Sequence, residues 1–286
     1  MSPATDLPPV AGLDRAVEDL VARHLRRPGA HVSVWLGGPG APASLVRDAA
    51  HEHYAASTMK LPLLVAAYRL HERGDLDLDA PVPVHNRFRS VLDGSAFELE
   101  QDDDQDDETW ARIGTSQPLR SLARHATVKS GNLATNVLFE HVGPAEVAAV
   151  LAGAGCSPAT ALPRTIGDAA ARSAGVDNLV TASDLARVMG GVALGRLASR
   201  ATCAEIESVL AAQEHRDQVP AGLPPGTYVA NKTGWVDGVA HDVALVRPAS
   251  RPPYVLALCT TADEPEETLY ALHAAVSAAV WERWTT

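Results

Sequence analysis

The chain has 286 residues, of which 46% are hydrophobic and 21% charged, and its formal net charge is −11 at pH 7. Such an apolar content excludes an intrinsically disordered chain, and the length fits one large domain or two intertwined ones. The negative charge argues against nucleic acid or an anionic membrane surface as the partner, because either would require a basic face.

Hydrophobic periodicity predicts the elements in chain order. A helix over 13–26 is followed by strands over 30–37 and 44–47. The middle of the chain is helical, and the C-terminal part returns to strands before a final helix. The predicted middle helices cover 61–73, 118–129, 133–142, 145–154 and 183–194, and the later elements are strands over 228–231, 239–246 and 254–260 and a helix over 266–284.

Strands at both ends of the chain, with helices between them, exclude two separate domains in series. The pattern predicts an α+β fold in which a five-stranded antiparallel sheet is built from both ends and flanked by the terminal helices. An all-helical lobe is inserted in the middle. We expect an α/β lobe from residues 1–56 and 209–286 and a helical lobe from residues 57–208.

The sequence carries no sign of export or of a membrane anchor. The N-terminal residues through Gly12 are proline-rich and polar, and the next predicted helix lacks the uninterrupted apolar core of a secretory signal. No stretch approaches the ~18 apolar residues of a membrane span. Cys156, Cys203 and Cys259 are odd in number and far apart, which argues against a disulfide framework. We therefore expect a reduced, cytoplasmic protein.

The segment from Glu98 to Glu108, called here the acidic segment, contains eight acidic and no basic residues, which leaves a net charge of only −3 for the rest of the chain. The default interpretation is a solvated insertion. The alternative is an anionic lid that favours a cationic substrate.

Lysine is rare in this chain, since only Lys60, Lys129 and Lys232 occur among 24 basic residues. Arginine keeps its proton near neutral pH, whereas a lysine can act as a base when its surroundings lower its pKa. These three positions are therefore the first candidates for chemistry. Lys129 also has a simpler interpretation as a favourable charge near a helix C-terminus.

The first candidate motif, Ser57-Thr58-Met59-Lys60, opens the predicted helix over 61–73. Positions i and i+3 share a helix face, so the Ser57 hydroxyl and the Lys60 amine would lie within reach of each other. A desolvated lysine can take the proton of a serine hydroxyl and so make it a nucleophile. By itself the pattern also fits a capping serine and a surface lysine.

Two further tripeptides favour the catalytic interpretation of this motif over the structural one. Ser130-Gly131-Asn132 lies at a break between two predicted helices, and Lys232-Thr233-Gly234 ends a predicted strand. In this order and on these elements, the three motifs resemble S-x-x-K, S-D-N and K-T-G of the class A β-lactamases and penicillin-binding proteins. The resemblance extends from about Leu13 to Trp284 and implies the β-lactamase/transpeptidase-like fold, with the active site between the two lobes.

The resemblance implies catalytic roles for three residues. Ser57 would be the acylated nucleophile and Lys60 its general base. Ser130 would relay a proton to the leaving nitrogen. The backbone N–H groups of Ser57 and Trp235 would form the oxyanion hole, which stabilises charge that develops during acyl transfer. The resemblance implies no metal and no other cofactor.

The resemblance also implies substrate contacts. Asn132 would bind the amide of a substrate side chain, and Lys232 and Thr233 would hold a substrate carboxylate. Gly234 and Trp235 would form the rest of the side of the site that binds the carboxylate.

The sequence departs from the family pattern at two places. The second motif has Gly131 where the family has Asp. The loop that begins at Arg164 and ends at Asp177 or Asn178 has no Glu in the register of the class A deacylating base, since residues 165–170 read T-I-G-D-A-A. Asp168 would replace it only with a shift of two residues. Without a carboxylate that positions water, hydrolysis of the acyl-enzyme should be slow.

These observations predict a serine acyl-transfer enzyme, either a hydrolase or a transacylase, that acts on a small carboxylate-bearing amide, lactam or ester. One alternative is a non-catalytic or single-turnover β-lactam-binding protein of the sensor type. Another is a true β-lactamase that uses Asp168 or another group as its deacylation base. The natural substrate, the acyl acceptor and the oligomeric state do not follow from the sequence.

Two histidine-containing patterns are weaker candidates. His51 and His53 would lie on one side of a strand, but a metal site would need a third ligand, so a half-buried strand is the preferred interpretation. His241 and Asp242 follow the third motif on the strand expected to face the site. A substrate-side role and a structural hydrogen-bonding role are both open for this pair.

Overall fold

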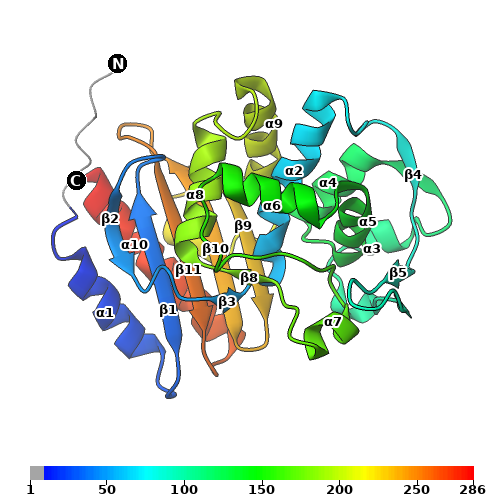
Figure 1. The fold of residues 1–286 in the computed structure, drawn as a ribbon. Helices are drawn as coiled ribbons and strands as arrows, with labels where there is room; N and C mark the ends of the chain where they lie inside the picture. The colour runs from blue at the N-terminus through cyan, green and yellow to red at the C-terminus, as the bar shows by residue number, and fades with distance from the viewer. Residues whose placement is uncertain (1–9) are drawn as a thin grey trace.

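A computed structural model describes residues 10–286 (Figure 1), and the proline-rich residues 1–9 lie outside the described residues. Its centre is a five-stranded antiparallel sheet with the strand order β2-β1-β11-β10-β9. The strands are β1 (His31–Gly37), β2 (Ala43–Arg47), β9 (Tyr228–Val236), β10 (Val239–Arg247) and β11 (Tyr254–Thr261). The two ends of the chain meet where β1 pairs with β11.

Helices cover both faces of the sheet because its strands carry apolar side chains on both faces. On β11, Leu256 and Leu258 pack into the core beneath α1 (Leu13–His24) and α10 (Glu266–Thr285). The alternate residues of β11 belong to a second core on the opposite face. There the sheet contacts α8 (Ala182–Ala193) and α9 (Arg200–Ala211).

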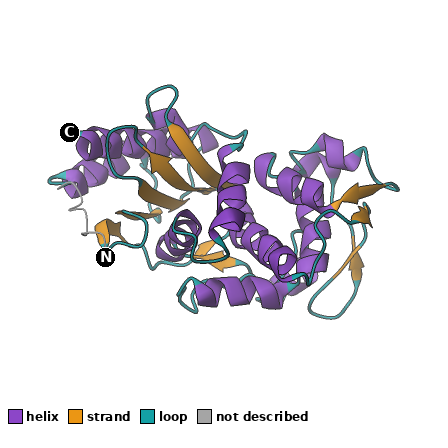
Figure 2. Cartoon of the chain, turned by 90° about the horizontal axis from the view of Figure 1, so that it is seen from above, coloured by secondary structure: helices purple, strands orange, loops and turns teal. Residues whose placement is uncertain are grey.

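The second core continues into the helical part of the molecule, which lies beside the sheet in Figure 2. Its centre is α2 (Lys60–Arg73), in which every residue from Lys60 to Tyr68 is buried. A helix that is apolar on all sides can be satisfied only by neighbours on all sides. These neighbours include α4 (Leu119–Val128), α5 (Asn132–Val142) and α6 (Pro144–Gly153).

Short elements complete the fold. Among the described residues these are the helices α3 (Asp107–Trp110) and α7 (Ala169–Ser173), the 3-10 helices η1 (Ala56–Met59), η2 (Gln101–Asp103) and η3 (Val219–Gly222), and the strands β3 (His53–Tyr54), β4 (Pro81–Pro83), β5 (Phe88–Arg89), β6 (Ala96–Phe97), β7 (Ser116–Pro118) and β8 (Leu179–Val180). The strands pair as β3-β8, β4-β7 and β5-β6. The inserted part is therefore helical with small ladders rather than all-helical, because strands of two or three residues are too short to show an alternating pattern.

The expected α+β fold with a five-stranded antiparallel sheet is confirmed. Besides these short elements, two longer elements differ from the prediction. Helix α9 was not predicted, and β9 runs through Lys232-Thr233-Gly234 instead of ending at it. The edge strand continues because all nine of its residues pair with β10, including the glycine that a sequence pattern marks as a break.

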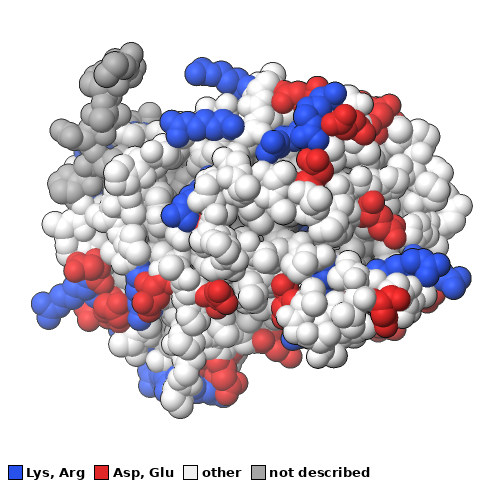
Figure 3. All heavy atoms as spheres, viewed as in Figure 1, with Lys and Arg blue, Asp and Glu red and all other residues white. Residues whose placement is uncertain are grey.

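The surface has no continuous basic area on the face drawn in Figure 3, where acidic and basic side chains lie in small mixed groups. Such a face lacks the positive stripe that nucleic acids require. Among residues 10–286, none of the helices has the length and apolar character needed to cross a bilayer.

Candidate active site

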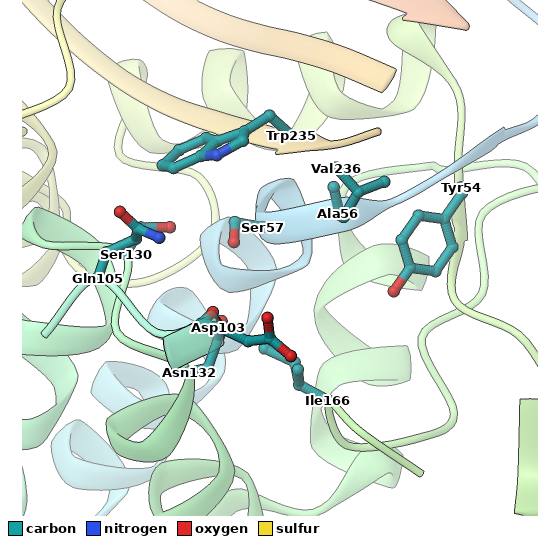
Figure 4. A pocket seen from close by; sticks show the side chains of 10 residues that line it. All are labelled: Tyr54, Ala56, Ser57, Asp103, Gln105, Ser130, Asn132, Ile166, Trp235 and Val236. Carbon is teal, nitrogen blue, oxygen red and sulfur yellow. Dashed lines mark hydrogen bonds between the residues drawn. The ribbon is translucent and has the colours of Figure 1, made fainter. Parts of the chain in front are cut away.

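Ser57 lies in a tight turn that leads from β3 into α2. The turn is η1, and α2 follows it without a break. Ala56 has a φ of 44°, a backbone conformation that residues other than glycine rarely adopt. The hydroxyl of Thr58 closes the turn on the carbonyl of Ala55 at 2.5 Å. The Ser57 side chain faces the pocket drawn in Figure 4.

The third motif packs directly against this turn. Because β9 is an edge strand, the outer side of its backbone can face Ser57. A Cβ atom added to Gly234 would lie 2.8 Å from the backbone nitrogens of both Ser57 and Thr58. Only glycine permits such an approach, and it brings the following residue, Trp235, to the wall of the pocket that holds Ser57 (Figure 4).

Lys60 is buried, with only 1% of its surface exposed. Its Nζ donates to the carbonyl of Ser130 at 2.6 Å and to Asn132 Oδ1 at 2.9 Å. Burial lowers the pKa of Lys60 to about 7, against the opposing charges of Asp104 and Asp106. A neutral amine has two protons to donate, so these two bonds leave its lone pair for a hydroxyl.

The hydroxyl of Ser130 lies between two lysines. Its Oγ is 3.3 Å from Lys60 Nζ and 3.1 Å from Lys232 Nζ. Ser130 has a φ of 62°, so this turn is strained like that of Ala56. The Ser130 hydroxyl, with its exchangeable proton, therefore connects Lys60 of the first motif to Lys232 of the third.

The expected contact between Ser57 Oγ and Lys60 Nζ is not among the hydrogen bonds of the described residues. The amine is directed instead toward the second motif, where Ser130 and Asn132 supply its acceptors. Catalytic hydrogen bonds are often long before substrate binds and tighten in the complex. The spacing therefore brings both groups to one site without joining them in this structure.

Asn132 begins α5, and the acidic segment holds it there. Asp104 accepts hydrogen bonds from the backbone nitrogens of Asn132 at 2.7 Å and of Leu133 at 2.8 Å. A carboxylate at this end complements the helix dipole. The carbonyl of Asp103 accepts from Asn132 Nδ2 at 2.9 Å, which directs the amide oxygen toward Lys60. The middle of the acidic segment is therefore part of the site wall, and a solvated insertion describes only its outer residues.

Lys232 and Thr233 are fully buried behind the pocket and do not line it. Lys232 Nζ also donates to the carbonyl of Thr233 at 2.8 Å. Burial and the charge of Lys60 hold the pKa of Lys232 well below its usual value, while Asp242 acts in the opposite sense. The hydroxyl of Thr233 has no hydrogen-bond partner among the described residues. Lys232 thus communicates with the pocket through Ser130.

A pocket of about 110 Å³ lies at the meeting point of these segments (Figure 4). Four of its lining residues were predicted, namely Ser57, Ser130, Asn132 and Trp235, and six were not, namely Tyr54, Ala56, Asp103, Gln105, Ile166 and Val236. Sequence proximity to Ser57 or Trp235 could have indicated three of the six. The other three come from the acidic segment and from the loop after Arg164, whose packing the sequence does not specify.

The loop over 164–178 is held closed at both of its ends. The guanidinium of Arg164 is buried and forms an ion pair with Asp177. Asn178 receives a hydrogen bond from the Arg164 nitrogen at 3.2 Å and donates to the Arg164 carbonyl at 2.9 Å. The sequence expectation that these residues mark the two ends of one loop agrees with these contacts.

Ile166 presents an apolar side chain to the pocket (Figure 4). Its backbone is fixed by Asn136, which accepts from the Ile166 nitrogen at 2.9 Å and donates to the Ile166 carbonyl at 2.8 Å. The position that faces Ser57 across the pocket is therefore rigid and carries no base.

Asp168 lies away from the pocket. Its Oδ1 accepts from the Ala171 nitrogen at 3.0 Å and caps α7, and its Oδ2 accepts from the Val91 nitrogen at 2.9 Å. The carboxylate is buried and does not line the pocket. This geometry favours a structural role for Asp168 over that of a base.

The weaker candidates have structural partners. His53 contacts Ser33 Oγ and Thr261 Oγ1, both at 2.9 Å, and burial lowers the pKa of His53 to about 3. His241 donates to the carbonyl of Tyr54 at 2.8 Å. Asp242 accepts from Asn231 Nδ2 at 3.0 Å, and burial raises the pKa of Asp242 to about 7.

Lys129, the third lysine, forms an ion pair with Glu108 of the acidic segment. It does not line the pocket. Within residues 10–286, no group of three or more His, Cys, Asp or Glu side chains is arranged to hold a metal ion.

Comparisons with known proteins identify the family and the fold. The family model described as "Beta-lactamase enzyme family" matches residues 12–284. A search of curated proteins found no significant match.

Three solved structures illustrate the structural similarity. A β-lactamase from Sphaerobacter thermophilus is 22% identical with a TM-score of 0.79, over 97% of this chain and 98% of that one. An ancestral class A β-lactamase of Gram-negative bacteria is 23% identical with a TM-score of 0.77, over 94% and 99% of the two chains. A PBP-A variant, solved as an acyl-enzyme complex with penicillin G, is 22% identical with a TM-score of 0.77, over 98% and 99%. At these identities the similarity establishes the fold.

Proposed function

The chain belongs to the β-lactamase enzyme family and is a β-lactamase-like serine hydrolase. On that premise we propose that Ser57 is acylated by a small carboxylate-bearing amide, lactam or ester. The observation that carries this proposal is the buried, hydrogen-bonded row formed by Lys60, the Ser130 hydroxyl and Lys232 beside the Ser57 turn.

The acylation step uses these residues in sequence. Neutral Lys60 takes the proton of the Ser57 hydroxyl while Oγ forms a bond to the acyl carbon. The backbone N–H groups of Ser57 and Trp235 stabilise the resulting oxyanion. When the bond from carbon to the leaving nitrogen breaks, the Ser130 hydroxyl gives that nitrogen its proton. Ser130 then regains a proton from the Lys60 ammonium, which returns Lys60 to its neutral form.

Substrate recognition follows from the other pocket residues. Asn132 binds the amide of the substrate side chain, and Lys232 attracts the substrate carboxylate toward the Ser130 side. Lys232 acts on this side through its hydrogen bond to the Ser130 hydroxyl at 3.1 Å, since Lys232 and Thr233 themselves lie behind the pocket.

A long-lived acyl-enzyme is the second candidate outcome, and one observation favours it. Ile166 occupies the pocket wall where a carboxylate would have to position water, and Asp168 is engaged elsewhere. The protein would then retain its acyl group or transfer it to an amine or alcohol. The structure-based proposal is therefore rapid acylation and slow hydrolysis.

Intact-mass spectrometry tests acylation. The protein is incubated with penicillin G, and in parallel with a fluorophosphonate that phosphonylates activated serines, and we expect one adduct per chain with each probe. Ser57→Ala should give none, whereas the matched variant Ser250→Ala, which changes an exposed serine, should react like the original chain. No adduct with either probe would contradict the proposed function.

The fate of the adduct distinguishes the two outcomes. An adduct that persists for hours, without product from nitrocefin or from ester substrates, identifies a protein that is acylated once. Many turnovers per chain identify a hydrolase with another water-activating group.

A further inference from the structure

Gly131 is the glycine of the second motif, and its backbone does not require glycine. Its φ of −59° and ψ of 127° are accessible to any L residue. Space is the constraint instead. A Cβ added at this position would lie 2.8 Å from Asp106 Cβ and 2.9 Å from Asp106 Oδ2. The volume that a side chain at position 131 would occupy is thus already filled by an acidic side chain from the acidic segment.

The carboxylate of Asp106 is built into the protein rather than exposed. Only 1% of the residue is accessible, and Asp106 Oδ2 lies 2.9 Å from His125 Nδ1. The hydroxyl of Thr109 donates to the same oxygen, and the Thr109 nitrogen to Oδ1 at 3.4 Å. These hydrogen bonds hold the pKa of Asp106 below its usual value although burial would raise it.

This carboxylate is connected to the catalytic turn by two routes. The carbonyl of His125 accepts a hydrogen bond from the Gly131 nitrogen at 3.2 Å, so Asp106 and His125 enclose the strained Ser130 turn from two sides. The negative charge of Asp106 also acts on buried Lys60 and favours its protonated form. Glu108 pairs with both His125 and Lys129, and the charge of Glu214 also acts on Lys129.

We propose that Asp106 is a positioning residue that takes, from the inserted acidic segment, the place of an acidic side chain at position 131 and holds Ser130 and Lys60 in their working geometry. This inference rests on the proposed acylation of Ser57. It explains why the motif tolerates glycine and gives part of the acidic segment a role that a solvated insertion would not have.

A relocation experiment tests the proposal. Asp106→Ala should slow acylation by penicillin G by up to about 100-fold, the cost of a misplaced catalytic group. Gly131→Asp alone should also be slow, because its side chain would collide with Asp106. The double variant Asp106→Ala/Gly131→Asp should regain most of the original rate, since it restores one carboxylate to the same volume. Asp102→Ala, which removes an exposed charge of the same segment, should react normally.

A second measurement does not depend on acylation. The chain has only three lysines, so selectively labelled Lys Nζ and Cε signals can be titrated individually by NMR. Asp106→Asn keeps the volume and removes the charge, so the titration midpoint of Lys60 should fall, while that of Lys129 should change less.

The outcomes separate this inference from the function it rests on. If the original chain forms no adduct, the proposed function fails, and the Lys60 titration still decides whether Asp106 acts on Lys60. If the original chain is acylated but the double variant is no faster than the slower single variant, the relocation proposal is overturned. An unchanged Lys60 midpoint in Asp106→Asn overturns it as well.

Discussion

The two walls of the pocket, one around Ser130 and the other formed by the 164–178 loop, carry different chemistry although both are rigidly held. The Ser130 wall combines two buried lysines, a shared hydroxyl and an amide. The loop wall is just as firmly fixed, through Asn136, but presents Ile166. Rigidity therefore does not identify the reactive side of a pocket, and the distribution of titratable groups does. In this protein that distribution is the basis for proposing acylation with slow hydrolysis.

The largest effect is expected from Gly234→Ala, which disturbs the turn that holds Ser57. The new methyl would lie 2.8 Å from two backbone nitrogens of the nucleophile turn, so the turn or β9 must move and the oxyanion donors with it. Loss of one such donor typically costs about 100–1000-fold in rate. We expect a decrease of this size in the acylation rate measured by intact mass.

Gly153→Ala is the matched control for this variant, because the added methyl would meet only the end of the Arg69 side chain at 3.5 Å. Thermal unfolding of both variants separates misfolding from misplacement. A folded Gly234→Ala protein that is acylated at the original rate would show that β9 does not position the nucleophile.

A smaller effect on rate should follow when a general base is introduced into the wall formed by the 164–178 loop. Ile166→Glu would place a carboxylate on a backbone that Asn136 already fixes, and general bases contribute about 10²–10⁴-fold. We expect hydrolysis of the acyl-enzyme to accelerate at least about tenfold. Decay of the adduct mass after removal of excess penicillin measures it. Ile166→Gln, with the same shape and no basicity, should remain slow, and equal rates for Glu and Gln would argue against an absent base as the limiting factor.

The pH dependence of the two steps is a graded effect, which is small near neutral pH and grows as the pH falls. Burial lowers the pKa of Lys60 to about 7, and only its neutral form can accept the Ser57 proton. The acylation rate should therefore fall by about tenfold per pH unit below that value. The rate at which the acyl-enzyme decays should not show this fall. Stopped-flow or quench-flow rates between pH 5 and about pH 8 provide the measurement.

His215 is one other group whose titration could produce such a fall in rate, because its ring lies 4.7 Å from that of Trp235. The fall of the acylation rate at low pH should persist in His215→Gln. Its disappearance in that variant would assign the titration to the imidazole and remove Lys60 from the role of base.

Much of the fold could be predicted from the sequence because its elements carry strong local patterns. Strand β1 and helix α10 were located to within one or two residues, since alternation and helical spacing are properties of the segment itself. Short ladders such as β4-β7 could not be predicted, because two or three residues form a strand only when a distant partner supplies the hydrogen bonds. Helix α9 was missed for a similar reason. The helical spacing of its apolar residues is weak, and its position is decided by packing against β9 and α2.

By itself the sequence determined the order of the elements and the three motifs that bring Ser57, Ser130 and Lys232 to one site. Short motifs suffice for this because each fixes its own turn or strand. Only the tertiary structure decided that Lys60 is buried with a lowered pKa, that Ile166 closes the opposite wall, and that Asp106 fills the volume beside Gly131. These properties depend on which distant segments exclude water and occupy space around a group, and no local pattern records that.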